Sequence, residues 1–392
     1  MSEAYIVAAA RTPGGRRGGR LSGWHPADLA AQVLDALVAK TGSDPALIED
    51  VIMGCVGQIG EQACNVARNA ILASSLPESV PGTSVDRQCG SSQQALHFAA
   101  QAVMSGTMDI VIAAGVESMS RVPMGTSMTL PAKNNMGFYV SPAMHKRYDG
   151  VEFSQFAGAE QMARKYELSK EMLDAYAFQS HRLAAEATRL GRFEEEIVPV
   201  AVRLAEGNSP DERMTVDEGI RFDTSLEGIA SVKLIQEGGR LSAASASQIC
   251  DGASGVMVVN ERGLKALGVP PMARIHNMTV IGHDPVIMLE APIPATQLAL
   301  KRAGLSLADI DAYEVNEAFA SVPLAWQKAL GANPDRLNVN GGAIALGHPL
   351  GASGTRLMTT LLHVLEQRGW RYGLQTMCEG GGLANVTIVE RL

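Results

Sequence analysis

The chain has 392 residues, 46% of them hydrophobic, so it can bury a large core and form about two or three domains. Its net charge is −8 and no basic block extends beyond Arg16-Arg17, which argues against a nucleic-acid-binding surface. The five cysteines are widely spaced and form no CxxC motif, so neither a disulfide framework nor a zinc site is indicated, and a reducing cytoplasm fits.

The N-terminal segment does not look like a membrane or export signal. Residues 5–9 are apolar but short, and they run into Arg11-Thr12-Pro13, which predicts a strand. No apolar run has the length of a transmembrane helix, and the C-terminal tripeptide is not the peroxisomal signal. We therefore expect a cytoplasmic protein without a membrane partner.

Residues 1–118 alternate short apolar runs with helical stretches, which is typical of α/β layers. The expected elements are strands at 6–9, 51–55 and 110–114 and helices at 27–40, 65–73 and 89–106. Residues 119–249 differ in texture and carry charged helices near 157–190, which predicts an inserted loop domain. Residues 250–269 return to small and β-branched types and are expected to complete the first half.

Residues 270–392 form a second α/β half that resembles the first. Cys89 opens a helix leading through Gly106 to a strand, and Gly351 opens a helix near 355–366 leading through Gly369 to the strand 373–377. A duplicated unit would bring the N-termini of these two helices to a common centre. Two unrelated α/β units remain the alternative.

Three candidate reactive residues lie at element boundaries beside glycine. Cys89 lies where a β-type run meets a helical one, and a helix N-terminus stabilises a thiolate. His348 lies in a glycine-rich loop at 340–351, and Cys378 ends an apolar run before three glycines. Two thiols and an imidazole in such settings predict one nucleophilic site. The alternatives are packed core thiols and a histidine that only caps its loop.

Five motifs, in order along nearly the whole chain, resemble the thiolases, the acetyl-CoA acyltransferase and acetyltransferase family. They are Arg87-Gln88-Cys89-Gly90-Ser91, Glu117-Ser118-Met119-Ser120, Asn316-Glu317-Ala318-Phe319-Ala320, Gly341-Gly342-Ala343-Ile344-Ala345-Leu346-Gly347-His348-Pro349 and Cys378-Glu379-Gly380-Gly381-Gly382. The resemblance implies two βαβαβαββ halves in a five-layered α-β-α-β-α arrangement, with a loop domain inserted in the first half.

The resemblance also implies roles for single residues. Cys89 matches the acyl-accepting nucleophile, His348 the imidazole that activates it, and Cys378 the acid/base that exchanges protons with the α-carbon and the incoming thiol. Asn316 matches the residue that holds an oxyanion-hole water, and the amide of Gly380, with that of Cys89, matches a second oxyanion hole. Asn316 follows an expected strand at 313–315 and is also a candidate helix N-cap.

Coenzyme A is implied as a co-substrate, with no permanently bound cofactor and no metal. Arg221, Ser247, Ala318 and Phe319 match positions that contact it, although Arg221 alone would suit a solvated surface. The family resemblance implies a homodimer or a homotetramer acting on acyl-CoA substrates.

The implied reaction is CoA-dependent thiolytic (retro-Claisen) cleavage of a 3-ketoacyl-CoA to acetyl-CoA and a shortened acyl-CoA, through an acyl-cysteine. Phe153-Ser154-Gln155 lacks the histidine and methionine of many small-substrate members, and Glu379 replaces a common apolar residue. We therefore expect a degradative enzyme for an acyl group larger than acetoacetyl, branched or cyclic. The alternatives are a biosynthetic acetoacetyl-CoA thiolase running the condensation and a non-catalytic acyl-CoA carrier.

The remaining sulfur-bearing residues are expected to be structural. Cys55, Cys64 and Cys250 are predicted to pack as core thiols, and the methionines between 119 and 144 are predicted to form an adaptable lining rather than a metal site.

Overall fold

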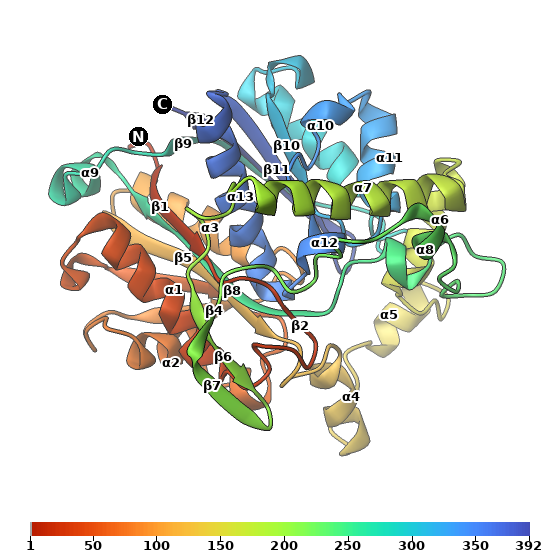
Figure 1. Ribbon diagram of the computed structural model, residues 1–392, viewed down its shortest axis with the longest axis horizontal. Coiled ribbons are helices and arrows are strands. Elements are labelled where there is room, and N and C mark those ends of the chain that lie inside the picture. Colours follow the sequence, from red (N-terminus) through yellow and green to blue (C-terminus); the bar gives the residue numbers. More distant parts are fainter. Residues whose placement is uncertain (1) are drawn as a thin grey trace.

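The computed structural model describes residues 2–392, apart from the side chains at positions 208 and 210. Its main sheet has two parts (Figure 1). The first part has the order β4-β3-β5-β8-β1, formed by β1 (Tyr5–Arg11), β3 (Asp50–Gly54), β4 (Gly82–Val85), β5 (Ile110–Ser118) and β8 (Cys250–Val259), with the short β2 (Gly15–Arg16) beside β8. The second has the order β10-β11-β12-β9, formed by β9 (Ala273–Gly282), β10 (Ala312–Val315), β11 (Tyr372–Glu379) and β12 (Leu383–Arg391).

The two parts meet where β1 pairs with β9 over two residue pairs, Tyr5 with Arg274 and Ile6 with Ala273. β5 and β8 are buried along their whole length. Strands covered by helices on both faces need this continuous run of small and β-branched residues.

Helices form three layers around and between the two sheet parts. α1 (Pro26–Thr41) and α2 (Val66–Ala73) cover the outer face of the first part, and α10 (Pro292–Ala303) and α11 (Ser321–Leu330) that of the second. α3 (Ser91–Met104) and α13 (Ser353–Arg368) share one buried cluster with strands of both parts and so lie between them (Figure 1). The five-layered α-β-α-β-α arrangement is therefore confirmed.

The second half departs from a strict duplicate at its third strand. In the first half this strand is β4, whereas in the second only an isolated bridge joins Tyr313 to Leu337. Asn338 and Gly341 follow with φ of 46° and 77°. These left-handed conformations end the extended run, because a pleated strand requires negative φ.

The segment between β5 and β8 contains α4 (Thr126–Lys133), α5 (Pro142–Arg147), α6 (Gln155–Lys165), α7 (Lys170–Arg189) and α8 (Leu226–Ala230). It also contains a hairpin, β6 (Val200–Leu204) with β7 (Gly207–Met214), that the sequence analysis did not predict. α9 (Glu261–Leu267) and α12 (Ala343–Leu346) complete the helices, with 3₁₀ turns at Pro45–Leu47, Gly60–Gln62, Ala243–Ser245, Leu307–Asp309, Pro334–Arg336 and Leu350–Ala352.

One expectation about sulfur-bearing residues is wrong. Met124, Met128 and Met136 stand on the surface, and α4 buries none of its residues, so the expected methionine lining stays a prediction. Cys64 is exposed, since it lies in a turn with φ of 56° ahead of α2, whereas the remaining predicted core thiols, Cys55 and Cys250, are buried.

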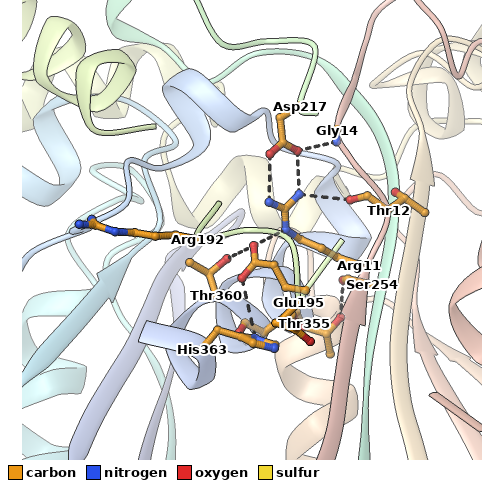
Figure 2. Close-up of polar contacts among 12 residues, drawn as sticks. Arg11, Thr12, Gly14, Arg192, Glu195, Asp217, Ser254, Thr355, Thr360 and His363 are labelled. Atoms are coloured by element: carbon orange, nitrogen blue, oxygen red, sulfur yellow. Dashed lines mark hydrogen bonds and ion pairs between the residues drawn. The ribbon is translucent and has the colours of Figure 1, made fainter. Parts of the chain in front are cut away.

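A buried ion-pair network ties the loop segment to the sheet and to α13 (Figure 2). The fully buried Arg11 guanidinium donates to both carboxylate oxygens of Asp217, at 2.7 and 2.9 Å, and to Glu196 at 2.6 Å. The Gly14 N–H donates to the same Asp217, and the Thr360 hydroxyl of α13 donates to Glu196. The network therefore fixes the position of Asp217, and with it the start of the segment that follows Asp217 in the chain.

Within residues 2–392, no helix combines the length and the apolar character that crossing a membrane requires.

Candidate active site

The turn that carries Cys89 is fixed by hydrogen bonds to the Ser91 side chain on either side of Gln88. Cys89 lies two residues ahead of α3, whose N-cap is Gly90. Gln88, just before it, has a φ of 50°, a conformation that non-glycine residues adopt only under constraint. The Ser91 hydroxyl supplies that constraint, because it accepts from the Arg87 N–H at 3.0 Å and donates to the Gln88 carbonyl oxygen at 2.5 Å.

The end of β11 meets this turn. The backbone N–H groups of Cys89 and Gly380 lie near the Cys89 sulfur, and both oppose the rise that burial causes in the pKa of this thiol. Cys378 lies one residue before the end of β11 and is fully buried, and a charge on Cys89 raises the pKa of the Cys378 thiol. The two sulfurs and the Gly380 amide thus belong to one small region.

The hydrogen bonds around His348 set its tautomer. Nδ1 lies 2.5 Å from Ser353 Oγ, and the Ser353 hydroxyl donates to the Pro349 carbonyl oxygen at 2.9 Å. Because the Ser353 hydroxyl has one proton and the Pro349 carbonyl can only accept, we assign Nδ1 as the donor to Ser353. Nε2 then keeps its lone pair and accepts from Asn316 Nδ2 at 3.4 Å. The assigned imidazole is neutral, with an unprotonated Nε2.

Asn316 connects the histidine to the β11 end. Its N–H donates to the carbonyl oxygen of Thr376, two residues before Cys378, at 3.0 Å. Its buried Oδ1 has no hydrogen-bond partner within the described part of the chain, so a water or ligand is required to satisfy it. The N-cap interpretation is wrong, because α11 begins only at Ser321, after Ala320.

Glu117 holds the His348 loop against the first half. Its buried carboxylate accepts from the N–H groups of Val56, Gly57 and Gly351, each at 2.9 Å, and from the Gln62 side chain at 2.8 Å. Gly351 belongs to the turn that leads from His348 into α13. Four donors on one carboxylate make this junction rigid.

Burial keeps the Cys89 thiol and the His348 imidazole neutral at rest. It raises the pKa of Cys89 to about 12, and an ionised Glu379 adds to the rise. It lowers the pKa of His348 to about 3, and the charge of Arg356 adds to the fall. The Cys89 side chain is nevertheless partly exposed, so a ligand can reach it. A thiolate at Cys89 is therefore costly unless a bound ligand compensates its charge.

A cavity of about 400 Å³ lies between the loop segment and the His348 loop. Arg221 and His181 line it on one side, and Ile344, four residues before His348, lines it on the other. The Arg221 N–H donates to His181 Nδ1 at 3.2 Å, and burial lowers the pKa of His181 to about 4. The lining thus offers one cationic side chain, Arg221, together with the acidic Asp223 and a neutral imidazole.

The other three predicted CoA contacts stand behind the wall of this cavity. Ala246 lines it and forms a β-bridge with Phe319, and the Ser247 N–H donates to the Ala318 carbonyl oxygen at 3.0 Å. This bridge also explains why the chain from Asn316 to Ala320 does not join α11, since it pairs with residues 245–247 instead.

Sequence reasoning missed Ser353 and His181. Ser353 lies five residues after His348 in the same glycine-rich segment, and this proximity was an available signal. His181 had none, because it lies in the middle of a charged helix and only the fold brings it to Arg221.

Comparisons with known proteins agree along the whole chain. Residues 4–262 match the family model for the thiolase N-terminal domain, and residues 269–391 match that for the thiolase C-terminal domain. The chain is 52% identical to a steroid 3-ketoacyl-CoA thiolase of Mycobacterium tuberculosis, covering 100% of this chain and 95% of that protein. It is 43% identical to a 3-ketoacyl-CoA thiolase of Yersinia pestis, with 100% of both covered.

The fold gives the same answer. A crystal structure of the Bacillus anthracis acetyl-CoA acetyltransferase superimposes with a TM-score of 0.90 at 34% identity, covering 100% of this chain and 99% of that one. The chain belongs to the thiolase family and is an acyltransferase.

Proposed function

We propose that this protein cleaves 3-ketoacyl-CoA thioesters with a bulky, ring-bearing or branched acyl group, in the degradative direction, and that Cys89, His348, Cys378, Asn316 and Gly380 carry the reaction. The observation that carries the proposal is the hydrogen-bonded state of His348, whose unprotonated Nε2 faces Asn316 while the Gly380 amide lies near the Cys89 sulfur.

Coenzyme A is proposed to enter the cavity between the loop segment and the His348 loop. Arg221 offers a positive charge in a chain whose net charge is −8, and phosphate groups seek such a side chain. Ser247, Ala318 and Phe319 would shape the wall through their bridge to Ala246.

In the first half-reaction, His348 Nε2 takes the Cys89 proton as the sulfur attacks the C3 ketone. The C2–C3 bond then breaks, and its electron pair leaves as the enolate of acetyl-CoA. Protonated His348 and a water on Asn316 stabilise the enolate oxygen, and such a donor typically contributes about 3 to 4 kcal/mol. Cys378 gives its proton to C2, which releases acetyl-CoA and leaves a Cys378 thiolate.

In the second half-reaction, the acyl group remains on Cys89 with its oxygen at the Cys89 and Gly380 amides. A second CoA gives its thiol proton to Cys378 and attacks the thioester. The Cys89 sulfur leaves and recovers its proton from His348, so every group returns to its starting state. Two thiols are needed because one holds the acyl group while the other moves protons.

Two features support a bulky acyl group. The relative at 52% identity is, by name, a steroid 3-ketoacyl-CoA thiolase. The aromatic segment at the start of α6 also meets the CoA wall, since Phe156 packs edge to face on Phe319 with ring centroids 5.5 Å apart. Phe153 packs against the core of the second half. Flat aromatic edges suit a ring system better than a short linear chain.

The test is acylation without turnover. The protein is incubated with acetoacetyl-CoA or with ring-bearing 3-ketoacyl-CoAs in the absence of free CoA, and the Cys89 peptide is weighed by mass spectrometry. We expect an acyl adduct whose mass reports the shortened acyl group, formed fastest with the ring-bearing substrates.

The matched controls are Cys89→Ser, which removes the acceptor sulfur, and Cys64→Ser, which removes an exposed thiol that the proposed reaction does not use. Only the first is expected to abolish the adduct. Absence of any adduct in the unmodified protein supports a non-catalytic carrier, and a clear preference for acetoacetyl-CoA contradicts the bulky-substrate proposal.

The cellular setting and assembly belong to the same proposal. Five free cysteines suit a reducing cytoplasm, and a homodimer or homotetramer is proposed from the family resemblance. Sedimentation equilibrium distinguishes these assemblies from a monomer.

A further inference from the structure

Glu379 is an ionisable active-site group that the proposed reaction does not use. It is the last residue of β11, between Cys378 and Gly380, and its side chain is fully buried. Neither carboxyl oxygen has a hydrogen-bond partner of good geometry among the described residues. A buried carboxylate without donors is costly, so this position calls for an explanation.

The Glu379 carboxyl lies directly against the nucleophile turn. A Cβ added to Gly90 would stand only 2.0 Å from Glu379 Oε1, so the carboxyl occupies the space next to the residue that follows Cys89. Three ionisable groups interact with it. The charge of Arg87 lowers the pKa of Glu379, and the charge of Glu379 raises the pKa of Cys89 and Cys378; Arg87 and Cys89 lie between β4 and α3, and Cys378 lies on the same strand as Glu379. From β12 it meets Asn385, which carries no charge.

Glu117 shows how many donors a buried carboxylate can receive in this protein: burial raises the pKa of its carboxyl, and each of the four donors opposes that rise. It is equally buried, yet it receives three backbone N–H groups and one side-chain amide. Only the charge of Arg87 and the backbone N–H of Asn385 favour the ionised form of Glu379, and neither carboxyl oxygen has a hydrogen bond of good geometry. The contrast indicates that the site holds the Glu379 carboxyl in its neutral, protonated form.

We propose that Glu379 is an electrostatic gate on the two thiols: its protonated carboxyl permits thiolate formation at Cys89 and Cys378, and its ionised carboxylate suppresses it. The inference rests on the proposed roles of these thiols. Burial raises the pKa of Glu379 to about 8, against the opposing effect of Arg87, and the Glu379 charge raises the pKa of both thiols. Thiolate formation is therefore suppressed above about pH 8, where Glu379 is ionised. Glu379 acts through its charge and carries no proton to or from the substrate.

The experiment measures the reactivity of Cys89 directly. The whole protein is alkylated with iodoacetamide between about pH 6 and pH 10, and the modified Cys89 peptide is quantified over time. In Glu379→Gln, we expect Cys89 alkylation about ten-fold faster than in the wild type near pH 9, because one unit of thiol pKa is a factor of ten, and a ratio near one at about pH 6. Glu379→Met removes the carboxyl without adding donors and is expected to behave alike, which keeps the test available if one variant folds poorly.

Arg87→Gln tests the gate by changing the pKa of Glu379 while keeping its carboxyl. Removal of this positive charge raises the pKa of Glu379, so the suppression of alkylation should begin at a higher pH than in the wild type, whereas Arg87→Lys should keep it in place. Glu314→Gln is the control, since Glu314 is a buried carboxyl on β10 whose charged neighbours are Arg356, Glu317 and Glu196. It should retain the wild-type alkylation profile.

Coincident profiles for the wild type and both Glu379 variants overturn the gate. Alkylation requires no turnover, so the two proposals fail separately. A profile that depends on Glu379 in a protein that forms no acyl adduct overturns the proposed cleavage alone, and an adduct with coincident profiles overturns the gate alone.

Discussion

The imidazole of His348 is held by a single hydroxyl group. Ser353 Oγ accepts a hydrogen bond from Nδ1 and donates one to the Pro349 carbonyl oxygen, so Nε2 stays free to act as a base in the proposed reaction. Such partners behind a catalytic group fix its tautomer and its orientation. The arrangement is local to one loop and the first turn of α13.

Ser353→Ala is therefore expected to slow the reaction without weakening substrate binding. Loss of the acceptor at Nδ1 lets the ring rotate and take the other tautomer, and we expect acyl-enzyme formation to fall roughly ten- to hundred-fold with little change in KM. Rapid-quench measurement of the Cys89 adduct checks this. Thr359→Val, which loses only a bond to its own helix, is the control. A fall in Ser353→Ala matched by a parallel rise in KM contradicts the orientation argument.

Glu379 should also leave a mark on stability. Its pKa is about 8 in the folded protein and near 4.5 in the unfolded chain. Below pH 4.5 Glu379 is protonated in both states and does not change the free energy of unfolding. As the pH rises towards 8, Glu379 ionises in the unfolded chain but stays protonated in the folded protein, which favours the unfolded chain. The native carboxyl therefore destabilises the protein progressively between pH 4.5 and 8.

Glu379→Gln, which cannot ionise, should accordingly gain stability relative to the wild type as the pH rises. We expect the difference in the free energy of unfolding to grow by about 2 to 4 kcal/mol between pH 5 and pH 8. Urea denaturation at the two pH values measures it, and any constant cost of the new amide cancels in the comparison. A difference that does not change with pH contradicts a neutral native carboxyl.

At the scale of elements, the Arg11 network joins β1, the loop segment and α13. Arg11 lies at the end of β1, Asp217 stands four residues before Arg221 of the proposed CoA cavity, and Thr360 of α13 reaches the same network through Glu196. Arg11, Asp217, Glu196 and Thr360 are buried, so the pairing is sensitive to the loss of one partner.

Asp217→Asn should cost about 3 to 5 kcal/mol of stability, because it leaves the buried Arg11 charge with Glu196 as its carboxylate partner. It should also weaken CoA binding by loosening the chain that leads to Arg221. Glu218→Gln is the matched control, because it loses a pair with the largely exposed Arg16 that is worth at most about 1 kcal/mol and keeps a side-chain oxygen for the Arg16 and Arg20 N–H groups. Urea unfolding and calorimetric titration with CoA check both effects, and equal losses in the two variants contradict the clamp.

The same scale shows how far the sequence can be read. Helix α1 is predictable because its apolar positions repeat at helical spacing and Pro26 and Gly42 mark its ends. The β6–β7 hairpin is not, since only Val200 and Val202 of β6 face the core and its charged partner strand has no such pattern. The start of α11 depends on the bridge from Phe319 to Ala246, two segments far apart in sequence.

Site prediction divides in the same way. Cys89, His348 and Cys378 stand in local glycine-rich motifs, so the sequence marks them as candidates. What surrounds them is set by packing between distant segments. The donors missing around Glu379, the link between His181 and Arg221 and the four donors on Glu117 arise only when the layers assemble.

At the scale of the whole molecule, the middle layer brings the two halves together. α3 follows Cys89 and α13 follows His348, and the two helices pack on each other between the sheet parts (Figure 1). Their contact is close because Gly354 of α13 has no side chain. A Cβ there would stand 2.1 Å from the backbone nitrogen of Gln93 in α3. The close approach of the two halves at the site thus depends on the absence of a side chain at Gly354.

Gly354→Ala tests this dependence. Alanine favours a helix over glycine by about 1 kcal/mol, but the contact is with backbone, which cannot turn away as a side chain can, so the clash should win. We expect a net loss of about 2 kcal/mol or more in the free energy of unfolding, together with slower acylation of Cys89, because the helices that follow Cys89 and His348 must move apart. Gly282→Ala, whose Cβ would meet Leu383 at an ordinary 3.8 Å, should change stability by less than about 0.5 kcal/mol. If Gly354→Ala instead unfolds at the same urea concentration as the wild type and acylates at the same rate, close packing of α3 on α13 is not what aligns the two halves.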